Sequence, residues 1–244
     1  MNAARRTAGV LWIVAPLVFA AGFAGLQLRF DYPDILRRPP GEVLVRFAAG
    51  GAELQAYWYA MTAAAVLMIG AAIATGLVLR RHGLLLAALS VGAGVLAGLV
   101  QALGLLRWVM LVPALATAYT APEATQLDKA MAVALFDAAN RYLGMGVGEH
   151  LGYLFTGAWT IFVSALLFRK SRVFALAGAV LAAGVVFGMA EPYGAPLAGA
   201  VNAAAYTLWT LWALVLGVMM LRDRREPQRA VWRAQQDSNL QPSA

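Results

Sequence analysis

Residues 84–106 read LLLAALSVGAGVLAGLVQALGLL, a run of 23 residues without a charged side chain. As a helix this run is about 35 Å long, which is enough to cross roughly 30 Å of hydrocarbon. Lipid offers no hydrogen bonds to the backbone, so a crossing segment has to be an α-helix or part of a closed β-barrel. Apolar and polar residues do not alternate here, and we therefore predict a transmembrane helix.

Five further stretches have the same apolar character. They lie at about 8–28, 57–79, 148–168, 173–190 and 200–221. The chain of 244 residues is 61% hydrophobic and 13% charged, with a mean hydropathy of +0.69, which is more apolar surface than a soluble protein of this size can bury. We predict an all-α polytopic membrane protein, a six-transmembrane-helix bundle over residues 1–221, and exclude a soluble enzyme.

The basic residues are distributed unevenly along the chain. The N-terminus, the turns at 80–83 and 169–172 and the tail hold 12 of the 19 basic residues, and the long connections 29–56 and 107–147 lie on the opposite side. Basic residues are retained preferentially in the cytoplasm, so we predict a bacterial inner-membrane protein with both termini cytoplasmic. The isoelectric point near 10.1 then reflects topology, and we expect no nucleic-acid partner.

The residue types also limit the cofactors. The chain contains no cysteine, which excludes disulfides, thiolate metal sites and iron–sulfur clusters. Its two histidines, His82 and His150, fall at opposite membrane faces, which excludes a bis-histidine haem. We expect no cofactor and no metal site.

The first long connection carries two adjacent arginines, Arg37 and Arg38, in a proline-containing segment that cannot form one continuous helix. Guanidinium groups suit a lipid head group or a substrate carboxylate. The acidic residues Asp31, Asp34 and Glu42 surround the pair, so a rigid, charge-balanced turn is the alternative interpretation.

The second long connection has a helical repeat. Apolar residues recur at Leu127, Met131, Leu135, Ala138 and Tyr142. This spacing predicts an amphipathic helix, which we interpret as an extracytoplasmic interfacial helix. It is either a lid over the bundle or a connector.

The entry to the fourth span, residues 144–153, reads GMGVGEHLGY and places a carboxylate beside an imidazole. The stretch lacks the third glycine and the preceding strand of a dinucleotide-binding motif. Glu149 and His150 point about 100° apart on a helix, so they do not imitate the paired histidines of a metalloprotease. Each therefore needs partners from elsewhere in the chain.

Ionisable residues also gather at the predicted outer ends of several spans, and we take them as candidate binding residues together with Arg37 and Arg38. They are Glu53, Arg107, Glu149, His150 and Glu191. If they converge, they form either a ligand or acid/base site or a network of ion pairs that fixes the helix ends.

The centres of the six spans contain no Asp, Glu, Lys, Arg or His, only hydroxyl groups such as those of Thr75 and Thr160. Proton-coupled transporters and ion channels usually place ionisable groups there, so neither class is favoured. Glycine pairs such as Gly94 with Gly98 suit close helix packing, within the bundle or in an oligomer.

The tail, residues 222–244, begins with a basic stop-transfer cluster and continues as a polar segment that we expect to be disordered. Asp237-Ser238-Asn239 can be encoded GAT-TCG-AAC, which lies within the reverse complement of a transfer RNA T-arm. We interpret the last ten residues as a candidate spurious extension of the reading frame.

Four short motifs carry a resemblance to a known family. They are FDYPDIL (30–36), LRW (106–108), VPAL (112–115) and GEHLGYLF (148–155). In these motifs the chain resembles the bacterial multi-pass membrane proteins of the domain of unknown function 4386 family. The resemblance implies a six-helix membrane fold, and it supplies no activity and no catalytic residues.

We therefore expect a membrane protein that binds a lipid, an amphiphile or a membrane partner at its extracytoplasmic rim. An interfacial enzyme with Glu149 or His150 as general base is the alternative, and a small-molecule permease is the third. The sequence favours no enzymatic activity.

Overall fold

The computed structural model describes residues 3–222, and these residues form helices and turns without a strand. The α-helices are α1 (Ala3–Phe30), α2 (Pro40–Leu79), α3 (Leu84–Met110), α4 (Val112–Thr120), α5 (Gln126–Ala139), α6 (Gly152–Leu167), α7 (Arg172–Phe187) and α8 (Ala198–Arg222). The shorter elements are the 3-10 helices η1 (Asp34–Arg37), η2 (Arg80–His82) and η4 (Gly188–Tyr193) and the π-helix η3 (Asn140–Leu151). The predicted tail beyond Arg222 lies outside the described residues.

Six helical segments are long and apolar enough to cross a membrane. They are Ala3–Phe30, Pro40–His82, Leu84–Thr120, Gln126–Leu167, Arg172–Tyr193 and Ala198–Arg222. Each contains one of the six spans predicted from the sequence. The prediction of an all-α, six-helix, multi-pass membrane protein is thereby confirmed.

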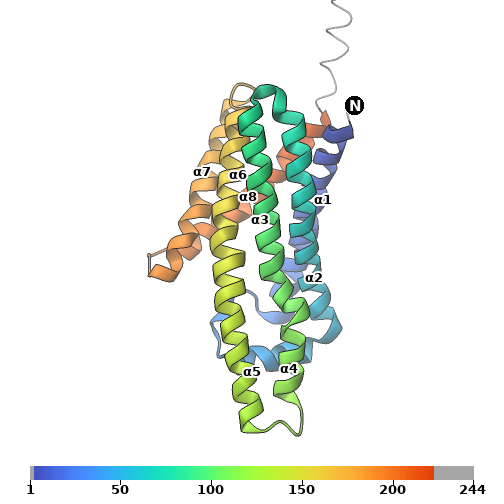
Figure 1. The fold of residues 1–244 in the computed structure, drawn as a ribbon, viewed down its shortest axis with the longest axis vertical. Coiled ribbons are helices and arrows are strands. Elements are labelled where there is room, and N and C mark those ends of the chain that lie inside the picture. Colours follow the sequence, from blue (N-terminus) through green and yellow to red (C-terminus); the bar gives the residue numbers. More distant parts are fainter. Residues whose placement is uncertain (1–2, 223–244) are drawn as a thin grey trace, which may run out of the picture.

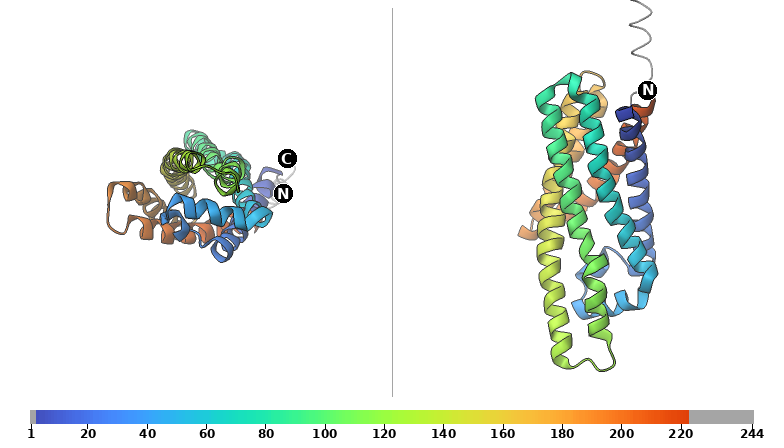
Figure 2. Two further views of the ribbon diagram at one scale, coloured as in Figure 1. Left: turned by 90° about the horizontal axis from the view of Figure 1, so that it is seen from below. Right: turned by 45° about the vertical axis from the view of Figure 1, so that its right-hand side comes forward.

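The two ends of the bundle differ, as Figure 1 shows. The N-terminal end carries the start of α1, η2 between α2 and α3, and the turn between α6 and α7. The opposite end, which we call the loop end, carries α4, α5 and the first part of α2. The hairpin of α4 and α5 extends well beyond the turn between α7 and α8 (Figures 1 and 2).

The first long connection is largely helical. Helix α2 starts at Pro40, which suits a first helical turn because no hydrogen bond is required of its nitrogen there. The helix is broken at Gly51, whose φ of 53° and ψ of −147° are accessible to glycine and strained for other residues. The part before Gly51 runs across the loop end of the bundle, beside the hairpin of α4 and α5 (Figure 2).

The amphipathic helix predicted in the second long connection is present as α5. It starts with a capping box formed by Thr125 and Asp128. It is not a separate element, because it continues through η3 into α6 as one long helical segment. The apolar residues Leu127, Met131 and Leu135 face away from the bundle, with exposures of 69%, 55% and 52%.

The N-terminal half of the bundle has a core of tryptophans from α1, α6 and α8. The Trp12 ring lies 4.6 Å from that of Trp159 and 6.0 Å from that of Trp209. The indole of Trp12 donates to Thr75 Oγ1 and that of Trp209 to Thr160 Oγ1, each at 2.8 Å. These membrane-embedded hydroxyls are therefore hydrogen-bond partners within the bundle.

A second aromatic core lies toward the loop end. The rings of Trp58 and Trp108 are stacked at 4.4 Å with an interplanar angle of 3°. Phe30, Phe47 and Phe136 surround Trp108 with centroids 5.7 to 5.9 Å away. This core joins α1, α2, α3 and α5, and it supports the residues of the candidate site.

Glycines allow α3 to approach its neighbours closely. A Cβ atom at Gly98 would lie 2.7 Å from the carbonyl oxygen of Ala65 in α2, and one at Gly94 would lie 2.4 Å from the Ala72 methyl group. The pair Gly94 and Gly98 is thus used for packing inside the bundle.

We predict that Gly98→Ala lowers the free energy of unfolding by about 1–3 kcal/mol, because the backbone of α2 has to move away. Gly92→Ala is the matched control on the same helix, since a Cβ at Gly92 has no atom within 4 Å. Unfolding in mild detergent measures both variants. Equal stability of the two would show that the contact of α2 and α3 is not tight at Gly98.

Candidate functional site

Arg107, in the last turn of α3, is the one buried charged residue among residues 3–222, with 8% of its surface exposed. One terminal nitrogen of its guanidinium group donates to the carbonyl oxygen of Gly104, and the other donates to Asn140 Oδ1 at 2.9 Å. Its Nε–H is buried without an acceptor in the described chain. The Nε–H of this arginine can therefore donate one more hydrogen bond, to an acceptor on a bound group.

The glycine-rich entry to the fourth span makes room for this arginine. Residues 140–151 form the π-helix η3, a rare helix type that is frequent at functional sites. A Cβ at Gly144 would lie 2.6 Å from Arg107 Nη2, and a Cβ at Gly104 would lie 2.6 Å from the Cα of Gly148. The backbones of α3 and η3 therefore touch, and the guanidinium group lies against Gly144.

Glu149 projects from the same π-helix and is half-buried. Its carboxylate forms no hydrogen bond or ion pair with another residue in the range 3–222. It interacts electrostatically with Arg107 and with the more distant, exposed Glu191. The arginine and the carboxylate thus share one region, but the carboxylate is not used in a direct contact.

Three tyrosines from different parts of the chain complete this region. Tyr32, Tyr153 and Tyr206 each interact electrostatically with Glu149. The rings of Tyr153 and Tyr206 lie 5.6 Å apart. We call Tyr32, Arg107, Asn140, Glu149, Tyr153 and Tyr206 the Glu149 cluster.

A polar seam continues from this cluster toward the centre of the bundle. Gln101 Nε2 of α3 donates to Thr156 Oγ1 of α6 at 3.0 Å. The Tyr206 hydroxyl of α8 donates to the same oxygen at 3.4 Å. Three helices are thus connected through Thr156 below the cluster.

Tyr32 lies outside the spanning segments, between α1 and η1. Its pKa is raised from 10.0 to about 12, mainly by burial and also by the Glu149 carboxylate, while Arg107 acts in the opposite direction. Its ring packs edge-on against Trp58 at 5.2 Å. Around neutral pH Tyr32 therefore offers a neutral hydroxyl group to the cluster.

Arg37 and Arg38 are exposed, and both form ion pairs with carboxylates of the same connection. Arg37 pairs with Asp34 at 2.8 Å, while Arg38 pairs with Asp31 at 2.9 Å and with Glu42 at 2.7 Å. The hydrogen bond to Glu42 is the main cause that raises the pKa of Arg38. The structure thus has the charge-balanced turn that was the alternative interpretation of this segment.

Glu53, His150 and Glu191 have different environments. Glu53 is exposed, pairs with Arg29 at 3.3 Å and accepts a hydrogen bond from Tyr57 at 2.7 Å. Glu191 is exposed in η4, and His150 is half-buried in η3 beside Glu149. Of the seven candidate residues, Arg107 and Glu149 interact electrostatically within the cluster, and Glu191 interacts with Glu149 and Tyr153 from its exposed position at the edge.

Sequence reasoning missed Tyr32, Asn140, Tyr153 and Tyr206, because uncharged side chains do not stand out in a charge map. Tyr32 and Tyr153 fall inside two of the quoted motifs, FDYPDIL and GEHLGYLF, which was the available signal. Residues 3–222 contain no group of three or more side chains arranged to ligate a metal. The chemistry of the cluster is that of one cation, one carboxylate and several hydroxyl groups.

We predict that Tyr32 ionises near pH 12, so the difference spectrum between the wild type and Tyr32→Phe should show phenolate absorption appearing there. An unfolded tyrosine ionises near pH 10. Because the folded pKa is the higher one, the stability that Tyr32 contributes is complete below about pH 10 and is lost as the pH rises to about 12. A phenolate that appears near pH 10 in the folded protein would contradict its burial beside Glu149.

Comparison with known proteins identifies a family. The family model described as domain of unknown function (DUF4386) matches residues 7–221. The match extends from the first turns of α1 to the last turn of α8. No curated protein and no solved structure matches the chain significantly.

Proposed function

Since this chain belongs to the DUF4386 family, whose function is unknown, we propose a function from the geometry of its own residues. The protein is an integral membrane protein that binds an amphiphile and holds the polar head group in the Glu149 cluster.

The observation that carries the proposal is a pair of charged groups whose hydrogen-bonding capacity is only partly used. Arg107 Nε is a buried donor without an acceptor, and Glu149 is a half-buried carboxylate without a direct partner among residues 3–222. Near the membrane such groups are costly, because a charge is poorly solvated and a buried donor loses its bond to water. A bound group that satisfies both would offset these costs.

The two groups define the head group that fits. Arg107 Nε needs an oxygen acceptor, while the Glu149 carboxylate needs a hydroxyl or amine donor. Tyr32, Tyr153 and Tyr206 add neutral hydroxyls that donate or accept. A head group with both an acidic oxygen and a hydroxyl or amine donor matches this set. The exposed Leu151 and Leu154, on the same helical segment, offer apolar surface for its chain.

The charge distribution supports an orientation in the bacterial inner membrane. The N-terminal end carries Arg5, Arg6, Arg80, Arg81, Arg169, Lys170 and Arg172. By the positive-inside rule this end faces the cytoplasm, so the Glu149 cluster faces the extracytoplasmic side. The amphiphile would then enter from the outer leaflet or the space above it.

Glu149→Gln is expected to weaken retention of a co-purifying amphiphile about ten-fold or more, because a hydrogen bond to a charged group contributes about 1.5–3 kcal/mol. Arg107→Lys keeps the charge but loses the Nε donor and should act in the same direction. Native mass spectrometry of protein purified in mild detergent measures the bound fraction.

Arg37→Gln is the control, since it removes an exposed loop-end arginine outside the cluster. An adduct retained equally by all three variants, or no adduct in the wild type, would contradict the proposal. In either case Arg107 and Glu149 would serve to position the ends of α3 and η3.

The orientation has a separate test. A reporter that is active only outside the cytoplasm should be active when inserted at Pro122, between α4 and α5, and inactive when inserted at Gly83, between η2 and α3. Both positions lie in turns, so the insertions should be tolerated. The reverse pattern of activity would place the Glu149 cluster in the cytoplasm.

A further inference from the structure

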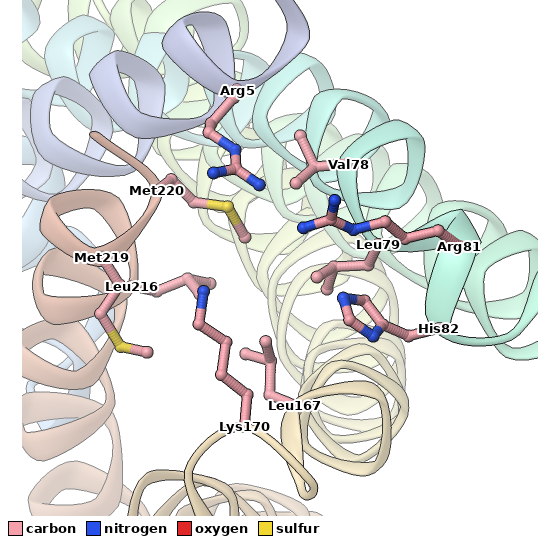
Figure 3. Close-up of a pocket in the computed structure, with 10 residues that line it drawn as sticks. All are labelled: Arg5, Val78, Leu79, Arg81, His82, Leu167, Lys170, Leu216, Met219 and Met220. Atoms are coloured by element: carbon pink, nitrogen blue, oxygen red, sulfur yellow. The ribbon is translucent and has the colours of Figure 1, made fainter. Parts of the chain in front are cut away.

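A basic pocket lies at the N-terminal end of the bundle, opposite the Glu149 cluster (Figure 3). Four basic side chains line it, namely Arg5, Arg81, His82 and Lys170. They come from the start of α1, from η2 and from the turn between α6 and α7. Figure 3 shows the four side chains reaching toward one gap from different directions.

The walls of this pocket are apolar and its charge is of one sign. Leu79, Leu167, Leu216 and Met220 contribute side chains from α2, α6 and α8. No described residue that lines the pocket carries a carboxylate. The combination of cations at the rim and hydrocarbon in the walls matches a charged head group joined to an apolar chain.

We propose that this pocket binds a phosphate group, carried either by an anionic lipid or by a small soluble phosphate compound. Arginine forks and a lysine ammonium are the side chains that bind phosphate oxygens most directly. Each of the four basic residues also has another interaction in the protein, so the proposal rests on their convergence.

The size of the pocket limits how the phosphate binds. The pocket is partly open to the outside and has a volume of about 20 Å³, which is close to the space of one water molecule. An oxygen of the phosphate fits into this space, and the rest of the group lies at the mouth, where the flexible Arg5, Arg81 and Lys170 side chains surround it. An acyl chain would then continue along the apolar wall.

The general excess of basic residues at this end does not by itself explain the pocket. Arg80 and Arg169 lie in the same two turns as Arg81 and Lys170, and they are not among the residues that line the pocket. These neighbours provide a matched comparison, because replacing either pair removes the same charge from the same turns.

The test compares Arg81→Gln/Lys170→Gln with Arg80→Gln/Arg169→Gln in the full chain, purified in a non-ionic detergent without phosphate. The probes are short-chain phosphatidylglycerol and inorganic phosphate, titrated by native mass spectrometry. We expect the wild type to bind one probe molecule, the pocket variant to bind it about ten-fold more weakly or worse, and the control variant to stay within about two-fold.

The two probes separate the sources of the phosphate. Binding of phosphatidylglycerol that inorganic phosphate does not displace identifies a lipid site, whereas binding of inorganic phosphate alone identifies a soluble ligand. Equal weakening in both double variants would overturn the proposal in favour of bulk surface charge, and so would a wild type that binds neither probe. Lys170→Gln against Arg169→Gln repeats the comparison with single changes if a double variant unfolds.

Discussion

The structure depends on one constraint, which is that lipid provides no hydrogen bonds to polar groups within it. The indole donors of Trp12, Trp209 and Trp212 are buried among the helices, and they are bonded to Thr75, to Thr160 and to the carbonyl oxygen of Phe174. Threonines such as Thr75 and Thr160 in turn donate to carbonyl oxygens of their own helices. The three indole bonds connect α1 with α2, α8 with α6 and α8 with α7, whereas the indole nitrogens of Trp58 and Trp159 and the Ser164 hydroxyl group are buried without a partner among the described residues.

The Glu149 cluster stands out against this background because its charges are only partly used. Backbone contact between Gly104 and Gly148 brings α3 against η3, and the absent side chain of Gly144 leaves space for the Arg107 guanidinium group. Asn140 and Gly104 then fix two of its nitrogens while Nε stays without a partner. A site of this kind, positioned by packing and incompletely satisfied, is the arrangement expected where a ligand supplies the remaining contacts.

The two ends of the bundle present different chemistry for physical reasons that follow from topology. The N-terminal end collects basic residues in short turns, and the helix ends bring four of them around one apolar gap. The loop end has longer connections, in which acidic and basic residues pair locally, as Arg38 does with Asp31 and Glu42. The proposed ligands differ accordingly, with phosphate at the first end and a head group of mixed polarity at the second.

The sequence by itself determined the fold class, the six spans and the family, because transfer of apolar side chains into lipid depends on composition and length and needs no tertiary contact. It also made Arg107 and Glu149 candidate binding residues together with five other ionisable residues, since charges at span ends are conspicuous. It could not show that α5 continues into α6 through a π-helix, or that Tyr32, Tyr153 and Tyr206 join Glu149. Only the tertiary structure decided the path of this helix and the position of the three tyrosines. Both depend on how closely the glycine-containing helices pack, and this packing determines which distant segments of the chain become neighbours.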